Sequence, residues 1–182
     1  MEAKKSWLQR LFGFELGLNT NPSPARRKQY RVGVTMLADN MKNERFRIGE
    51  EWHAEIVAEL MVGRTSKNDE LLIYSDSLAP EFYAKILENS KCRIRILFGN
   101  TKALGILRAL PQGAKDRIDF RASNTPRGKH FLVVGSSVRC EVNNQGDELD
   151  ACCNFNEPDA AQRLRDRFES MWEEASPWKS VT

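Results

Sequence analysis

The sequence predicts an α/β fold in which helices flank a mixed β-sheet. From residue 69 onward, short apolar segments with strand patterning alternate with amphipathic segments, as in a sheet whose strands are joined by crossover helices. After residue 129 three strand-like segments follow one another, and the chain then reaches its strongest amphipathic helix. The 182 residues are 41% hydrophobic and 29% charged, which fits one globular domain with an N-terminal extension.

Individual elements are expected where the apolar periodicity changes. Helices are predicted over residues 48–62, 79–89, 102–110 and 156–172, the last with Asn156 as its cap. Strands are predicted over residues 71–74, 92–98, 118–122, 130–134, 138–142 and 151–155. Residues 32–41 fit either a short strand or the start of a helix.

Two N-terminal segments precede the predicted domain, which covers residues 32–182. Residues 1–18 form an amphipathic segment, and residues 19–31 are predicted to be a linker because they are polar and contain Pro22 and Pro24. Residues 1–31 carry seven basic and two acidic side chains, a net charge of +5 in a chain whose total is +3. Attraction to anionic partners is therefore expected at the N-terminus, because the rest of the chain is close to neutral.

Composition excludes several classes of protein. The longest apolar runs, at residues 71–74 and 131–134, are far shorter than the roughly 18 residues of a bilayer-spanning helix. A cleaved secretion signal is not expected, since polar residues interrupt the apolar stretch that follows the first lysines. The cysteines lack the spacings of a zinc site, so we expect a reduced, cytoplasmic protein with no metal or other cofactor. They are Cys92, Cys140, Cys152 and Cys153.

Residues 130–172 resemble the C-terminal part of one repeat of the phospholipase D superfamily. In that superfamily a strand carrying H-x-K-x4-D is followed by a hairpin, a strand carrying G-S-x-N and a long closing helix. The matching pieces here are His130-Phe131-Leu132-Val133-Val134, Ala151-Cys152-Cys153-Asn154-Phe155-Asn156 and the helix that follows. With the alternating segments upstream, the likeness extends over residues 69–172 and implies a phospholipase D-like half, that is, a single repeat of the fold.

Departures from the motif argue against catalysis. In the superfamily the histidine attacks phosphorus to form a phosphohistidine, while the lysine and asparagine hold the phosphate oxygens whose charge grows in the transition state. With His130 at the histidine position, Leu132 occupies the lysine position and Ser137 the aspartate position. A leucine cannot neutralise an oxyanion. Lys129 is no substitute, because adjacent residues of a strand point to opposite faces.

The resemblance therefore implies an inactive enzyme without catalytic residues. The superfamily mechanism needs two motifs, whereas this chain offers one degenerate copy in which Ala151 and Cys152 replace the Gly-Ser pair. Degenerate members look like ligand-binding or protein-docking modules. The residues expected to line an anion-binding groove of that kind are His130, Asn154, Arg127 and Arg139. The alternative for the two arginines is that they are ordinary surface charges.

The N-terminal segment is predicted to form a short amphipathic helix. Its apolar face consists of Trp7, Leu8, Leu11 and Phe12, with Lys4, Lys5 and Arg10 beside it. It is similar to the membrane-targeting helices of peripheral bacterial proteins, including the Min-system ATPase. On an anionic leaflet each nearby basic residue would add roughly 1 kcal/mol of binding free energy. Three destinations fit this helix: a membrane surface, the groove of a partner protein, or the chain's own domain.

Together these features predict a non-catalytic binding or adaptor module that the N-terminal helix brings to a membrane surface or a protein assembly. Its partner is then a protein or an anionic membrane at the inner face of the cell membrane, and homo-oligomers are compatible with it. The alternative is a nucleic-acid-binding protein, or a residual phosphodiesterase or nuclease acting as a dimer. The basic residues for that alternative are Arg26, Arg27, Lys28 and Arg31.

Overall fold

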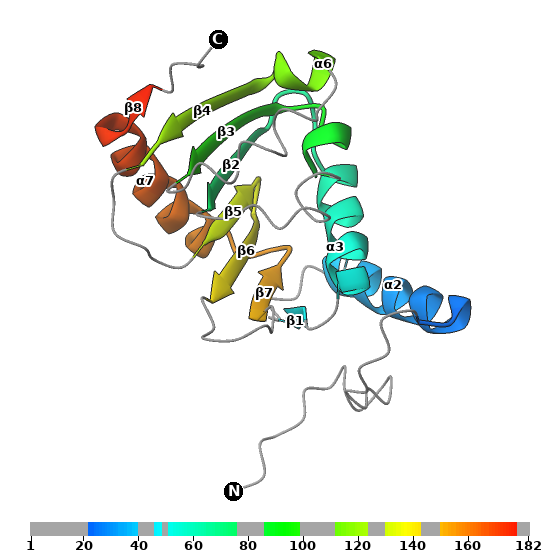
Figure 1. Cartoon of the computed structure of the whole chain (residues 1–182). Helices are drawn as coiled ribbons and strands as arrows, with labels where there is room; N and C mark the ends of the chain where they lie inside the picture. Colours follow the sequence, from blue (N-terminus) through cyan, green and yellow to red (C-terminus); the bar gives the residue numbers. More distant parts are fainter. Residues whose placement is uncertain are drawn as a thin grey trace, which may run out of the picture.

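A computed structural model of the chain describes residues 22–39, 46–48, 51–75, 86–98, 112–123, 130–142 and 150–177. Its helices are α2 (Pro24–Asp39), α3 (Glu51–Gly63), α6 (Gln112–Lys115) and α7 (Pro158–Glu174), and residues 86–89 are helical as well (Figure 1). The strands are β1 (Phe46–Ile48), β2 (Glu70–Ser75), β3 (Arg93–Phe98), β4 (Ile118–Ala122), β5 (Phe131–Val134), β6 (Ser137–Val142), β7 (Asp150–Asn154) and β8 (Ser176–Pro177).

All strands of the described residues belong to one mixed sheet. Their order across the sheet is β1-β7-β6-β5-β2-β3-β4-β8. β2, β3 and β4 run parallel to one another, whereas every other neighbouring pair is antiparallel. The sheet therefore has a parallel half built by crossovers and an antiparallel half built by consecutive strands, as the alternation of elements predicts.

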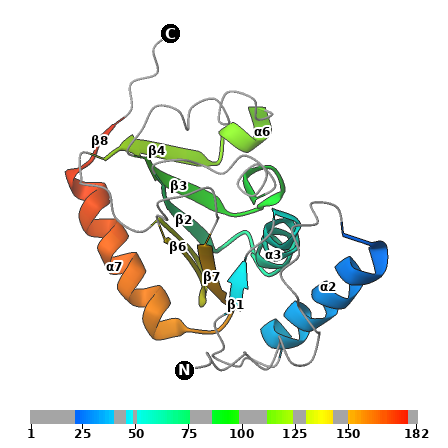
Figure 2. The ribbon, with the colours of Figure 1, turned by 60° about the horizontal axis from the view of Figure 1, so that its bottom comes forward.

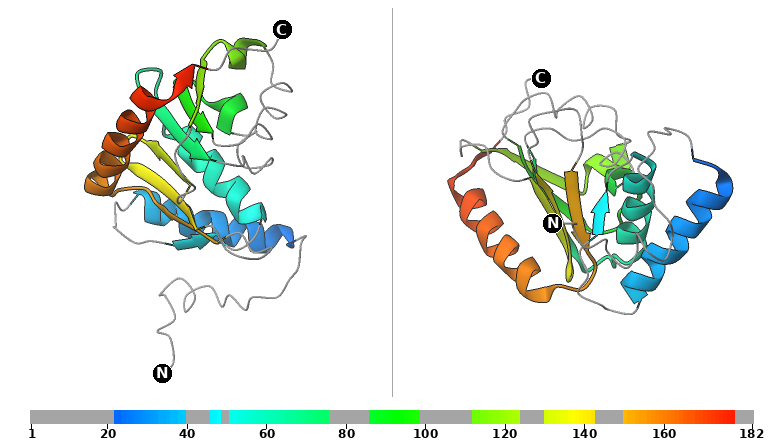
Figure 3. Two further views of the ribbon diagram at one scale, coloured as in Figure 1. Left: turned by 60° about the vertical axis from the view of Figure 1, so that its left-hand side comes forward. Right: turned by 90° about the horizontal axis from the view of Figure 1, so that it is seen from below.

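Helices cover both faces of this sheet. The long helix α7 lies against one face, α3 lies against the other, and α2 packs outside α3 (Figures 2 and 3). The buried apolar side chains fall into two clusters accordingly, one between the sheet and α3 and one between the sheet and α7. In β2, Leu71 and Ile73 belong to the α3 cluster, while Leu72 and Tyr74 belong to the α7 cluster. Both faces of β2 are thus buried, which explains its uninterrupted apolar sequence.

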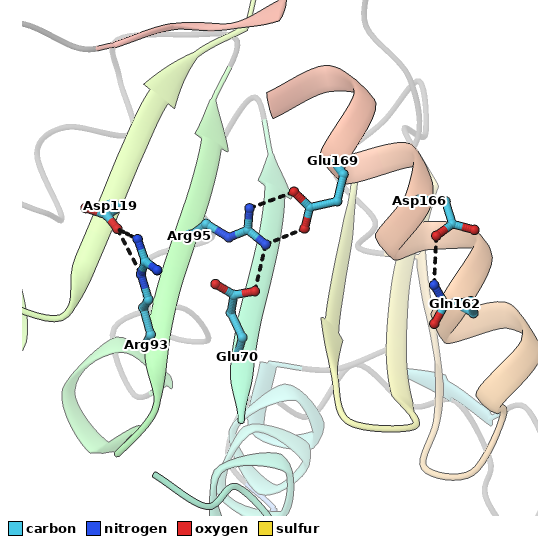
Figure 4. Close-up of polar contacts among 7 residues, drawn as sticks. All are labelled: Glu70, Arg93, Arg95, Asp119, Gln162, Asp166 and Glu169. Atoms are coloured by element: carbon cyan, nitrogen blue, oxygen red, sulfur yellow. Dashed lines mark hydrogen bonds and ion pairs between the residues drawn. The ribbon is translucent and has the colours of Figure 1, made fainter. Parts of the chain in front are cut away.

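Charged side chains hold α7 on the sheet. Arg95 of β3 contacts Glu70 of β2 at 2.6 Å, and its guanidinium forms a forked pair with Glu169 of α7 (Figure 4). The same guanidinium lies 5.4 Å from the ring centre of Phe168 and 5.3 Å from that of Trp172. Arg95 therefore pairs electrostatically with both carboxylates and packs on two aromatic rings beneath the helix.

The predicted linker is wrong over its second half, because residues 24–31 belong to helix α2. Pro24 is the first residue of the helix, where the missing N–H of a proline costs nothing and its fixed φ favours the helical turn. The helix is then held on α3: the Arg27 guanidinium lies 2.7 Å from the Glu55 carboxylate, and the ring of Tyr30 stacks on that of His53 at 4.1 Å. Residues 32–39, which fitted either a strand or a helix, continue the same helix.

The other predicted elements are mostly confirmed where the structure describes them. Each predicted strand appears within one or two residues of its expected bounds, and α3 and α7 appear as helices. The predicted cap of α7 is wrong: the N-cap is Glu157, without a side-chain capping hydrogen bond. The short strands β1 and β8 were not predicted. The predicted helix at 102–110 and the amphipathic segment at 1–18 lie outside the described residues.

Among the helices that the structure describes, none combines the length and the apolar character that crossing a bilayer requires.

Candidate functional site at the carboxyl edge of the sheet

The three parallel strands end at one edge of the sheet. β2, β3 and β4 finish at Ser75, Phe98 and Ala122, and these residues lie in register. β5 runs antiparallel to β2 and starts at this edge, since Phe131 pairs with Tyr74. In open α/β sheets ligands bind outside the carboxyl ends of the parallel strands. We therefore take this carboxyl edge as the candidate site.

Polar side chains are buried next to the strand ends at this edge. Ser75 is 0% exposed, Ser123 is 9% exposed and His130 is 5% exposed. The backbone N–H of Ser123 donates to the carbonyl of Phe98 at 2.9 Å, which fixes the chain as it leaves β4. The ring of His130 meets the ring of Tyr74 edge-on, with centres 6.3 Å apart. Hydroxyl and imidazole groups both donate and accept hydrogen bonds, but here the protein encloses these side chains.

The position of the motif lysine is part of the core. Leu132 is 0% exposed, pairs with Ile73 of β2 and belongs to the cluster beneath α3. A cation placed there would be surrounded by apolar side chains instead of phosphate oxygens. This geometry agrees with the absence of a lysine in the sequence.

A cation does lie close to the start of β5, but on the other face of the sheet. The guanidinium of Arg167, from α7, lies 5.6 Å from the ring centre of Phe131. Phe131 belongs to the cluster beneath α7, whereas Leu132 belongs to the cluster beneath α3. Arg167 therefore does not occupy the place of the missing lysine.

His130 and Asn154, both predicted to line an anion-binding groove, lie far apart in the sheet. Asn154 pairs with Val138, which pairs with Val133, so Asn154 is level with the far half of β5 and two strands away from it. The separation from His130 is then roughly 10 Å along the strands and roughly 10 Å across them. The intervening strand β6 causes this separation. The two side chains do not converge on one groove.

The side chain of Asn154 stabilises the turn that follows β7. Its side-chain oxygen accepts a hydrogen bond from the backbone N–H of Asn156 at 2.8 Å, which turns the chain from β7 toward α7. Among the described residues its buried Nδ2 has no hydrogen-bond partner. Ser137, at the aspartate position of the motif, lies near Asn154, and its hydroxyl donates to the carbonyl of Phe155 at 3.2 Å.

Most of the remaining predicted site residues lie outside the part of the chain that the structure describes. Arg127 lies outside the described residues, and so do Trp7, Leu8, Leu11, Phe12, Lys4, Lys5 and Arg10. Arg139 lies in β6, in register with Leu132 and Cys153. Within the described ranges no group of three or more His, Cys, Asp or Glu side chains is arranged to hold a metal ion. Sequence reasoning missed Ser75 and Ser123, whose only signal is a serine directly after a buried strand.

Comparison with known proteins finds similarity in structure alone. No family model matches the sequence. No curated protein matches it either.

Solved structures that share the fold include the following three proteins. TrmBL2, an archaeal chromatin protein, superposes with a TM-score of 0.55 at 13% identity over 85% of this chain and 62% of TrmBL2, so this chain spans less than two thirds of that protein. Nuc from Salmonella typhimurium, a phospholipase D family member, gives 0.55 at 13% identity over 75% of this chain and 100% of Nuc. NucT from Helicobacter pylori gives 0.50 at 11% identity over 74% of this chain and 99% of NucT. The chain thus has a phospholipase D-like α/β fold, as predicted.

Proposed function

We propose that this chain is a non-catalytic phospholipase D-like module that binds a partner at the carboxyl edge of its sheet. The observation that carries the proposal is Leu132, a fully buried apolar side chain where the motif requires a cation. Without that cation, the charge that develops on phosphate oxygens has no partner from β5. The burial of His130 adds support, because a nucleophile must reach phosphorus in line with the leaving group.

A hydrolysis assay tests the loss of catalysis. The full chain is incubated with bis(p-nitrophenyl) phosphate and with single- and double-stranded DNA, at concentrations that allow dimers to form. We expect product at the rate of the buffer blank, both for the wild type and for His130→Ala. Cleavage by the wild type that His130→Ala abolishes would contradict the proposal.

Recruitment by the N-terminal segment is the finer part of the proposal. The apolar face of residues 7–12 and its basic neighbours support binding at an anionic surface. Sedimentation with vesicles of phosphatidylglycerol and phosphatidylcholine measures this binding, with pure phosphatidylcholine as the control. We expect the full chain to sediment with the anionic vesicles, and the double substitution Trp7→Ser/Phe12→Ser to stay in the supernatant. Equal sedimentation of the two proteins would overturn recruitment by this face.

Nucleic-acid binding is the second candidate function, favoured by the structural likeness to TrmBL2, whose structure shows a mode of DNA binding. The basic cluster of α2 gives it little support, because Arg27 pairs with Glu55 and Arg31 pairs with Glu59. Internally neutralised cations release few counterions on binding DNA. Fluorescence anisotropy with a labelled duplex decides between the candidates. Saturable binding that weakens steeply with salt, and is lost in Arg27→Gln/Arg31→Gln, would favour DNA.

A further inference from the structure

A cavity of about 220 Å³ lies at the edge of the sheet opposite His130. It is bordered by the ends of α2 and α3, the residue before β2, the turn between β5 and β6, and the chain after β7. β5 separates it from His130 by about 13 Å, the length of four extended residues. The volume is below the roughly 300 Å³ at which pockets for drug-sized ligands begin, so only a small molecule fits.

Two opposite charges line this cavity without forming an ion pair with each other. The Arg64 guanidinium pairs with Asp39 at 2.5 Å and donates to the carbonyl of Leu60 at 3.3 Å. Those contacts use two of its five N–H donors. The Asp69 carboxylate accepts one hydrogen bond, from the backbone N–H of Ser66 at 2.6 Å. Asp39 already offsets the charge of Arg64, so Arg64 offers a ligand its remaining N–H donors, whereas the Asp69 carboxylate offers lone pairs and its charge.

The remaining lining combines hydroxyl groups with an apolar floor. Ser136 and Ser137 both donate to the carbonyl of Phe155, at 3.3 and 3.2 Å, which leaves lone pairs on each hydroxyl oxygen. Met61 and Val134 are buried apolar residues that line the same cavity. Gly135, with φ of 53°, makes the tight turn that brings Ser136 and Ser137 to its wall.

We propose that this cavity binds a small zwitterion with an aliphatic side chain, that is, an α-amino acid such as valine or leucine. The ligand's carboxylate would pair with Arg64 and its ammonium group with Asp69, while its side chain lies on Met61 and Val134. A ligand with a single charge would interact with either Arg64 or Asp69, but not with both. A third charge on the side chain would face the apolar floor without a partner.

This site would make the chain a sensor as well as a docking module. Its lining comes from the ends of α2 and α3 and from the β5–β6 turn, so a bound ligand would link these segments. None of its charged residues takes part in the carboxyl edge. A test of ligand binding in this cavity is therefore independent of any test at the carboxyl edge.

Isothermal titration calorimetry on the full chain tests the inference. The probes are valine, leucine, methionine and alanine, with glutamate and lysine as amino acids with charged side chains, and with acetate and isobutylamine as the separate charges. We expect at least one aliphatic amino acid to saturate the protein at millimolar concentration and to bind more tightly than the other probes. We expect Arg64→Gln and Asp69→Asn each to weaken that binding about tenfold or more, because each removes a charge-assisted contact.

The matched controls are Arg93→Gln and Asp119→Asn, which make the same changes in an exposed ion pair elsewhere on the sheet. They should leave the affinity unchanged. Thermal unfolding monitors folding, and Asp69→Asn decides the outcome if Arg64→Gln is unstable, because asparagine still accepts the Ser66 hydrogen bond. Failure of every aliphatic amino acid to bind, equal binding of acetate or isobutylamine, or unchanged affinity in the cavity variants would overturn the inference.

Discussion

At the scale of single residues, Leu132 carries the proposal that the chain is not a phosphodiesterase. Its side chain is sealed between the sheet and α3, with Ile73 as its neighbour in β2. Restoring a lysine would place an ammonium group in an apolar cluster, where a charged group without a partner is strongly disfavoured.

We predict that Leu132→Lys lowers the free energy of unfolding by about 3 to 5 kcal/mol, the cost of an unpaired buried charge. Leu132→Met, which keeps the volume and stays apolar, should cost less than about 1.5 kcal/mol. Urea denaturation followed by circular dichroism measures both. A lysine variant as stable as the methionine variant would mean that position 132 opens to water or to an anion.

His53 is expected to make the free energy of unfolding depend on pH. Its ring lies between Tyr30 and Trp52 at the contact of α2 with α3. Burial, and to a smaller extent the charge of Arg26, lowers the pKa of His53 from 6.5 to about 4. Between these two values the folded protein keeps the ring neutral, whereas the unfolded chain takes up a proton. The contribution of His53 to stability is therefore complete above pH 6.5 and is lost as the pH falls toward about 4.

We predict that the wild type loses up to about 3 kcal/mol of stability through this residue as the pH falls over that range. His53→Phe keeps an aromatic ring in the stack and removes the titration, so its stability should depend less steeply on pH. Urea denaturation at several pH values between 4 and 6.5 gives the two slopes. Parallel slopes would show that His53 is accessible to protons in the folded state.

At the scale of elements, α7 illustrates how a half-buried ion pair fastens a helix to a sheet. The Arg95 side chain is 12% exposed and contacts carboxylates from both β2 and α7. Two residues earlier in the same strand, Arg93 pairs with Asp119, but its side chain is 65% exposed. The two arginines therefore form a matched comparison of a covered pair and an open pair.

We predict that Arg95→Ala costs about 2 to 3 kcal/mol, in the range of hydrogen bonds to charged groups, because the substitution removes both carboxylate contacts and the packing on Phe168. Arg93→Ala should cost less than about 1 kcal/mol, as exposed ion pairs do. Thermal or urea unfolding of the two variants measures the difference. Equal losses would contradict the assignment of α7 docking to Arg95.

The ion pair between Arg95 and Glu169 makes the stability of the protein depend on pH. The hydrogen bond from Arg95 is the main cause that lowers the pKa of Glu169 below its usual 4.5. The stabilisation by Glu169 is therefore present above pH 4.5 and is lost as the pH falls through the lower value of the folded state. Glu169→Gln should reduce the acid sensitivity of unfolding, measured by circular dichroism during an acid titration. An unchanged acid transition would argue against the pair.

At the scale of the whole molecule, local patterns predicted most of the fold. The strands β2 to β7 carry apolar runs or alternation that a sequence displays directly, and α7 carries a complete apolar stripe. The helix α2 was missed because Pro22 and Pro24 suggested a linker, although a proline is compatible with the first helical turn. β1 and β8, with three and two residues, are too short for any periodicity.

The candidate site was harder to predict, because it depends on register. The sequence predicts three successive strands after residue 129, but not that they pair in that order, which places β6 between His130 and Asn154. The cavity bordered by Arg64 and Asp69 draws its walls from segments scattered over the chain. Only pairing between distant strands brings such groups together. The identity of the residue at position 132 needs no such pairing, because the sequence shows directly that an apolar side chain stands there.

If the chain is non-catalytic, as proposed, His130 forms no bond to phosphorus. The most direct test mixes the full chain with bis(p-nitrophenyl) phosphate, quenches the mixture rapidly, and records p-nitrophenolate release together with the intact mass of the protein. We expect no burst of p-nitrophenolate and a protein mass equal to that of the untreated chain. A burst equal to the protein concentration, with a phosphorylated adduct that is absent from His130→Ala, would contradict the account.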